Sequence, residues 1–126
     1  MRSGNTISDA EMKIMKLLWE KSPRTMPELT AALAPETGWS KHMVIALLKR
    51  MLEKGSIRVE ESKPARLYYP IIEKESVEKA KTHKLLEELF HGKARYLVSA
   101  MVEQGDLSGE DIDELIDYLE KVKEGE

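Results

Sequence analysis

The sequence predicts a mainly α-helical protein with one small β-hairpin, built as a winged helix-turn-helix head and a helical tail. Residues 8–54 contain three short amphipathic segments with tight connections, and two alternating strand-like segments follow them directly. From residue 71 onward the pattern is purely helical and highly charged. We therefore expect two domains, residues 1–70 and residues 71–126.

The first helix should begin at a capping box. Ser8 and Glu11 have the S-x-x-E spacing in which each side chain accepts a hydrogen bond from the other residue's backbone N–H. The helix should end near Ser22-Pro23, because the residue before a proline disfavours the helical region. Its apolar face consists of Met12, Met15, Leu18 and Trp19.

A second capping box, Thr25 and Glu28, predicts a shorter helix. Pro27 is tolerated in the first turn, where its missing N–H would have no partner. We expect Pro35 to stop this helix. Its buried side would be formed by Leu29, Ala32 and Leu33.

The third helix has the clearest helical periodicity of the head. Ser40 is its expected N-cap and Gly55 its expected C-terminal cap. The apolar positions follow i, i+3, i+4, i+7, i+8 spacing. They are Val44, Leu47, Leu48, Met51 and Leu52.

A hairpin should follow the third helix. Apolar and polar residues alternate over 57–60 and again over 66–69. Ser62-Lys63-Pro64 is the expected turn, and Pro70 should end the second strand. Tyr68 is interpreted as a core or hairpin residue in preference to a DNA contact.

The tail should contain helices over residues 73–90 and 93–103 and a third that starts at Ser108. Asp111 occupies the capping-box position of the last helix. Three thin amphipathic helices enclose little core of their own, so a second copy of the chain should complete them. We therefore predict a homodimer held mainly through residues 73–123.

Charge is distributed very unevenly along the chain. The net charge is −3, but residues 40–70 contain seven Lys/Arg and three Asp/Glu, a net charge of +4. Residues 71–126 contain eight basic and fifteen acidic residues, a net charge of −7. An acidic protein with one concentrated basic segment can bind a polyanion locally. We therefore expect the basic segment to bind DNA.

The predicted DNA contacts lie mainly on the exposed face of the third helix. Lys41 and His42 are in the first turn, which usually reaches base edges. Ile45 and Ala46 could pack on thymine methyl groups. The remaining contacts are expected at phosphates, from the third helix, the turn and the start of the second helix. These residues are Lys49, Arg50, Lys63, Arg66, Arg24 and Thr25.

Other features argue against other classes of protein. There is no cysteine, and the longest apolar run, Met43 to Leu48, is far too short for a membrane span. We expect a cytoplasmic protein. The three histidines lack the spacing of zinc ligands, and no catalytic motif is present, so we expect no metal, no cofactor and no enzymatic activity.

The order and spacing of several segments resemble the BlaI/MecI repressors, winged-helix regulators of β-lactamase genes. The resemblance covers residues 7–122. The segments that carry it are ISDAE at 7–11, GWS at 38–40, the Leu-x-x-Arg and following Lys-Gly within 47–55, Tyr-x-Pro at 68–70, Phe90-x-Gly92 and LSGEDIDEL at 107–115.

The resemblance implies a dimeric repressor that binds a palindromic operator of β-lactam-resistance genes. It also implies release from DNA by proteolysis, triggered by a membrane sensor. Family members commonly carry threonine or lysine where this chain has Met43, Ile45 and Ala46. The family's cleavage position aligns near Ala100-Met101, without the Asn-Phe pair of its best-known members.

Two other functions fit the same residues. The head could bind DNA under the control of a small ligand held in the tail, which would make the protein a ligand-responsive regulator of other genes. Alternatively, the winged head could be a protein-interaction module. Salt-sensitive DNA binding would separate the first two functions from the third.

Overall fold

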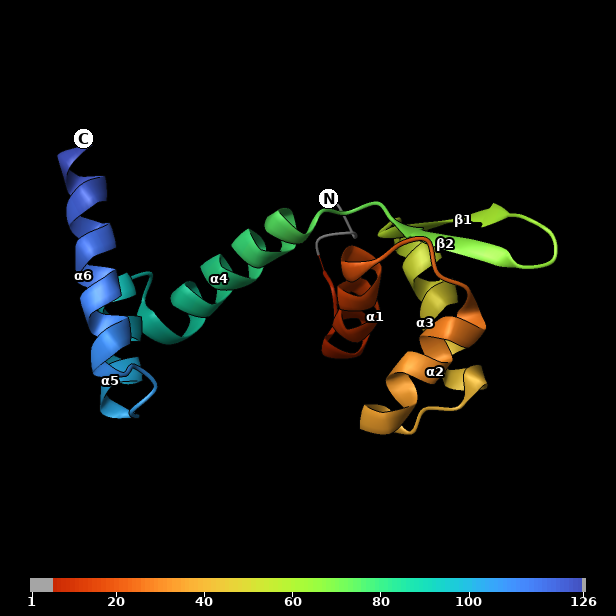
Figure 1. Cartoon of the computed structure of the whole chain (residues 1–126), viewed down its shortest axis with the longest axis horizontal. Coiled ribbons are helices and arrows are strands. Elements are labelled where there is room, and N and C mark those ends of the chain that lie inside the picture. Colours follow the sequence, from red (N-terminus) through yellow and green to blue (C-terminus); the bar gives the residue numbers. More distant parts are fainter. Residues whose placement is uncertain (1–5, 126) are drawn as a thin grey trace. The chain divides into compact units, whose positions relative to one another are not determined.

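The computed structural model describes residues 6–125 (Figure 1). Its elements are α1 (Asp9–Glu20), α2 (Met26–Thr37), α3 (Lys41–Lys54), β1 (Ile57–Glu61), β2 (Arg66–Pro70), α4 (Lys74–Phe90), α5 (Ala94–Glu103) and α6 (Gly109–Glu124). The chain divides into two compact units, one ending at Lys81 and the other beginning at Thr82. The mainly helical fold with one hairpin is as predicted.

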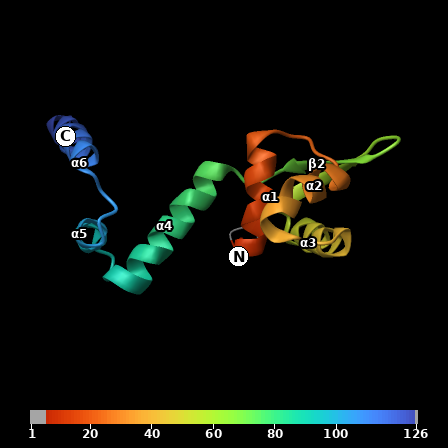
Figure 2. The same cartoon turned by 60° about the horizontal axis from the view of Figure 1, so that its bottom comes forward.

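The first unit, called the head below, has a single apolar core between α1, α2, α3 and the hairpin. The apolar faces of the three helices meet there, as their periodicity predicts. Figures 1 and 2 show α1, α2 and α3 grouped together beside the hairpin. The fully buried side chains include Ile14, Met15, Leu18, Leu29, Val44, Leu47, Leu48, Met51 and Ile57.

Local sequence signals set most helix ends in the head. Capping boxes are formed at Ser8 and at Thr25, and the Ser40 hydroxyl accepts a hydrogen bond from the Met43 N–H. Gly55 ends α3 with φ of 85°, a left-handed conformation that glycine adopts without steric cost. The predicted starts of these three helices are confirmed.

The predicted stop of the second helix at Pro35 is wrong. Helix α2 continues to Thr37, with Pro35 inside it, and ends at Gly38, whose φ is 67°. Proline removes one hydrogen bond within a helix, but here only two helical residues follow it. The left-handed glycine is therefore the stronger stop signal, and the helix is as long as α1.

The hairpin is a two-stranded antiparallel sheet with Ile57 opposite Pro70 and Glu61 opposite Arg66. Tyr68 is buried, as predicted, and its backbone exchanges two hydrogen bonds with Arg24. The connection between α1 and α2 is therefore held against the outer edge of β2. The turn end of the hairpin projects away from the helices of the head (Figure 1).

The start of α4 belongs to the head by its packing. Val77 is buried in the head core. The Trp19 indole Nε1–H donates to the Ile72 carbonyl at 3.0 Å, and the Lys81 ammonium donates to the Ile7 carbonyl at 2.8 Å. These contacts fix the segment that leads out of the hairpin and the first turns of α4 against α1.

The second unit, called the tail below, contains the rest of α4, with α5 and α6. The capping box at Ser108 and Asp111 is formed, as predicted. No residue from 82 to 125 is buried, and α5 and α6 make few contacts with each other. Large apolar side chains are exposed on all three helices: Leu85, Leu89, Tyr96, Val98, Val102, Leu115, Ile116, Leu119 and Val122.

Each helix found within residues 6–125 is too short or too polar to span a lipid bilayer.

Candidate nucleic-acid interface

The exposed face of α3 is the largest group of predicted contact residues that the structure brings together. Val44, Leu47, Leu48 and Met51 are buried, so the opposite side of the helix faces solvent. Five predicted residues lie on that exposed side: Lys41, His42, Ile45, Ala46 and Lys49. Neither Lys41 nor Lys49 forms an ion pair within residues 6–125.

Two apolar side chains are unusually accessible on this helix. Met43 is 38% exposed and Ile45 is 43% exposed. Isolated apolar residues are common at protein surfaces. Here, however, they interleave with Lys41, His42 and Lys49 on a helix that can enter a groove, where thymine methyl groups offer an apolar surface.

Arg50, also predicted on this face, has a more restricted position. Its side chain is 56% exposed, yet its Nε donates to Glu11 Oε2 at 3.0 Å. Lys54 approaches the other oxygen, Oε1, at 2.8 Å. One carboxylate from α1 therefore holds two basic side chains of α3, one turn apart.

Glu11 itself is completely buried. Burial of the carboxylate opposes its ionisation, but Lys54, the Ser8 backbone N–H and Arg50 all donate to it, and together they lower its pKa below the usual 4.5. It is thus an ionised group that connects the capping box of α1 to the far half of α3.

Glu11 and Lys54 were missed as part of the site by the sequence reasoning. Glu11 was identified only as a capping residue, and its partners lie 39 and 43 residues away in sequence. A local motif cannot indicate such partners. One signal was available in the sequence: Glu11 lies next to the apolar face of the first helix, where a carboxylate needs a partner.

Arg24 is occupied by intramolecular contacts. Its Nε donates to the carbonyls of Leu17 and Lys21, each at 3.0 Å, and a terminal nitrogen lies 3.3 Å from Glu20 Oε1. The Arg24 guanidinium thus closes the C-terminal end of α1, where the helix leaves carbonyl groups without partners.

Thr25 caps α2, since its hydroxyl accepts a hydrogen bond from the Glu28 N–H. It also lines a small hollow of about 270 Å³ with Pro64, Arg66 and Tyr68. The structure therefore brings the start of α2 and the wing together, as a shared phosphate-binding surface would require.

The wing, residues 57–70, carries Lys63 and Arg66 as predicted. Lys63 is exposed in the turn and unpaired within the described part of the chain. Arg66 forms an ion pair with Glu61 at 2.9 Å, and this hydrogen-bonded contact raises the arginine pKa further above its usual value. Of the two predicted wing residues, Lys63 is therefore unpaired and Arg66 is already paired. A third basic side chain of the wing, Arg58, stacks on the Tyr69 ring, with its guanidinium carbon 3.9 Å from the ring centroid.

The remaining predicted residues lie in the tail. Ala100 and Met101 are half-buried within α5, so their peptide bond is in helical conformation. Among residues 6–125, no three His, Cys, Asp or Glu side chains gather in a way that could hold a metal.

Three helices with a basic third-helix surface and an adjoining two-stranded wing define a winged-helix DNA-binding protein. The sequence matches the family model described as "Penicillinase repressor" over residues 7–121. The chain therefore belongs to the penicillinase repressor family, which confirms the resemblance found in the sequence.

Individual relatives agree with this assignment. The penicillinase repressor of Bacillus licheniformis is 31% identical over 117 residues, which cover 93% of this chain and 91% of that protein. The methicillin resistance regulatory protein MecI of Staphylococcus aureus strain N315 is 26% identical over 115 residues, which cover 91% of this chain and 94% of that protein.

A solved structure is similar to the head. The solution structure of the DNA binding domain of the repressor BlaI superimposes with a TM-score of 0.54 at 28% identity, covering 60% of this chain and 93% of that domain. The chain is thus a DNA-binding transcriptional repressor, and its family is not one of enzymes.

Proposed function

We propose that this repressor binds a palindromic operator as a homodimer. In this proposal residues 1–70 form the DNA-binding domain and residues 71–126 the dimerisation domain. The observation that carries the dimer is the tail: no residue from 82 to 125 is buried, while apolar side chains are exposed along its helices. Exposed apolar side chains of this kind are stabilised when a second copy covers them.

Within each head, α3 acts as the recognition helix. Lys41 and His42, in its first turn, contact base edges, and Ile45 and Ala46 pack against thymine methyl groups. Lys49 contacts phosphate and fixes the register of the helix without reading sequence. Arg50 contacts the DNA backbone as well, and its hydrogen bond to Glu11 fixes the position of its side chain.

The wing and the start of α2 contact the flanking phosphates. Lys63 is the main contributor, because it has no ion-pair partner within residues 6–125. Arg66, Arg24 and Thr25 contribute less: the two arginines are already bound to carboxylates, and the Thr25 hydroxyl is used by the α2 cap.

The regulated genes are β-lactam-resistance genes in this proposal, and the protein acts in the cytoplasm. Support comes from two relatives whose names state penicillinase repression and methicillin resistance regulation. Induction would involve a membrane sensor and proteolysis near Ala100-Met101. Because that bond lies within α5, a protease would need α5 to unfold locally first.

Selection of bound sites from random DNA with the purified protein, at two salt concentrations, tests the proposal. We expect a palindromic site whose half-site spacing matches a whole number of helical turns. Affinity should fall with a slope of about −0.9 per phosphate contact in a log–log plot against salt. Recovery of single, unpaired half-sites would contradict the dimer, and salt-independent binding would contradict the phosphate contacts.

A further inference from the structure

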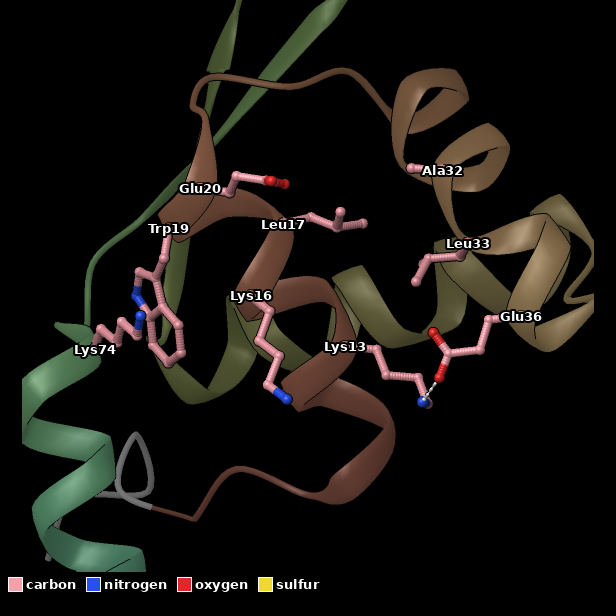
Figure 3. A pocket seen from close by; sticks show the side chains of 9 residues that line it. All are labelled: Lys13, Lys16, Leu17, Trp19, Glu20, Ala32, Leu33, Glu36 and Lys74. Atoms are coloured by element: carbon pink, nitrogen blue, oxygen red, sulfur yellow. Dashed lines mark hydrogen bonds and ion pairs between the residues drawn. The ribbon is translucent and has the colours of Figure 1, made fainter. Parts of the chain in front are cut away.

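A groove of about 570 Å³ lies between α1 and α2, on a part of the head that contributes nothing to the proposed DNA face (Figure 3). All residues that line it come from α1, α2 or the first position of α4. Neither α3 nor the wing contributes a lining side chain. The volume is within the range of about 300–1,000 Å³ that small-molecule sites usually have.

The floor of the groove is apolar, and one wall of it is an aromatic ring. Leu17, Ala32 and Leu33 lie between the two helices, with Trp19 at the end nearer α4 (Figure 3). The indole Nε1–H of Trp19 donates to the Ile72 carbonyl at 3.0 Å, which orients the ring. An aromatic surface held in this way can receive a flat apolar group without losing further side-chain freedom.

Basic groups surround this floor in excess over acidic ones. Lys13 pairs with Glu36 across the groove, and Glu20 is paired with Arg24 outside it. Lys16 and Lys74 also line the groove, and neither forms an ion pair within residues 6–125. Glu20 is thus engaged by Arg24, and Glu36 by Lys13, with a smaller contribution from the charge of Lys16. The ammonium groups of Lys16 and Lys74 make no direct ion pair among residues 6–125, so both can bind a ligand.

We propose that this groove binds a small organic acid with an apolar, preferably aromatic, body. The acid group is held by Lys16 and Lys74, and the body lies over Leu17 and Leu33 against the Trp19 ring. The carboxylate supplies the direct ion-pair partner that those lysines lack, and the apolar body removes the floor from water. The site is separate from the proposed operator contacts, so ligand and DNA do not compete for the same side chains.

A ligand in the groove would also contact the start of α4. Lys74 is the first residue of α4, and the Trp19 indole is hydrogen-bonded to the carbonyl of Ile72, two residues before Lys74. A ligand that contacts both side chains therefore ties α1 to the segment that leads to the tail. Binding should stabilise that segment by mass action.

The test uses the full chain with 1-naphthoate as probe and 1-naphthamide as its uncharged counterpart. The indole N–H resonance of Trp19 is followed in ¹⁵N-labelled protein, and Trp39→Phe assigns the two tryptophan signals. We expect a saturable shift of the Trp19 signal with 1-naphthoate. The amide should bind at least about tenfold more weakly, because it lacks the charge that the lysines recognise.

Two variants and a control make the result specific. The double variant K16A/K74A should lose at least about tenfold in affinity for 1-naphthoate, since both charged donors are gone. Ala32→Trp should block the groove sterically, and because Ala32 is exposed the substitution leaves the core intact. The control K41A/K49A removes two lysines of α3 and should bind the probe as the unchanged chain does.

Each alternative result would overturn the proposal. A Trp19 signal that does not move, or that moves equally with K16A/K74A, would show that the groove is only a solvated surface. Equal binding of the amide would show apolar adsorption without recognition of the acid. Shifts confined to backbone amide signals of the tail, in the same ¹⁵N spectra, would place the probe on the exposed apolar helices.

Discussion

Glu11 Oε2 accepts a hydrogen bond from Arg50 Nε at 3.0 Å, so the carboxylate that caps α1 also holds the recognition helix. Its other oxygen is shared between the Ser8 backbone N–H and the Lys54 ammonium. Three donors thus surround one buried carboxylate. This carboxylate is the ion-pair partner of both Arg50 and Lys54, the two basic side chains of α3 that approach the core. Glu11 thus adds a charged contact between α1 and α3 to the apolar packing of the core.

Replacement of Glu11 by glutamine should destabilise the head by about 1–3 kcal/mol. Glutamine keeps an oxygen for the Ser8 N–H, but it faces Arg50 Nε with an amide donor and loses the charge. The matched control is Glu28→Gln, since Glu28 occupies the same capping-box position in α2 but is exposed and bonded only locally. Urea denaturation of both variants measures the difference. Equal losses would mean that the contacts with α3 add nothing to the cap.

The contribution of Glu11 should also depend on pH. Its pKa is lowered in the folded protein relative to the usual 4.5, so the unfolded chain takes up the proton first as the pH falls. The stability that this carboxylate provides is therefore fully present above about pH 5 and is lost as the pH falls through its lowered pKa.

Unfolding free energies of the unchanged chain and of Glu11→Gln, measured between pH 7 and about pH 3.5, check this sign. We expect the gap between the two proteins to be constant at the upper end and to narrow at the lower end. A gap that widens in acid would show that the pKa of Glu11 is raised.

Lys49 and Arg50 are neighbours, but their replacement by alanine should have different effects on DNA binding. Lys49 has no ion pair within residues 6–125, so its loss should weaken binding to all sequences and reduce the salt slope by about 0.9. Arg50 is already bound to Glu11, so its loss should change the slope less and stability more. Fluorescence anisotropy over a series of salt concentrations, with urea denaturation in parallel, separates the two effects. Identical slopes for both variants would contradict this assignment.

Leu119→Glu should weaken the proposed dimer while leaving the head folded. Leu119 is 58% exposed on α6, in line with Leu115 and Ile116, where a charge would be buried by a partner. Sedimentation equilibrium should give a dimer dissociation constant at least about tenfold higher than that of the unchanged chain. Glu120→Gln, at the next position of the same helix, serves as the control. An unchanged dimer in Leu119→Glu would move the interface away from this stripe.

Much of the head could be predicted because its signals are local. Capping boxes, the glycine after α3 and the spacing of apolar residues each depend on residues within one or two turns. The start of α2 was predicted in this way, but its end was not. Pro35 alone is expected to stop the helix, but a proline in the last turn costs only one hydrogen bond, whereas the left-handed Gly38 reverses the chain direction.

The parts that could not be predicted depend on contacts between distant residues. Arg24, Arg50 and Arg66 all looked like free cations in the sequence, yet each is bound to a carboxylate. For Arg50 the partner lies 39 residues away. Among the predicted contact residues, the charge that remains available to DNA therefore comes from lysines, and composition alone could not distinguish them from the paired arginines.

The lack of any buried residue from 82 to 125 has a consequence for how much of this repressor a cell must hold. If a second copy supplies the missing core, the folded fraction of the tail rises with protein concentration. Dilution, for example by cell growth after synthesis stops, would expose α5 and α6 to degradation before the head is affected. A lower concentration of the repressor would then shorten its lifetime. Its level would therefore fall faster than dilution alone predicts.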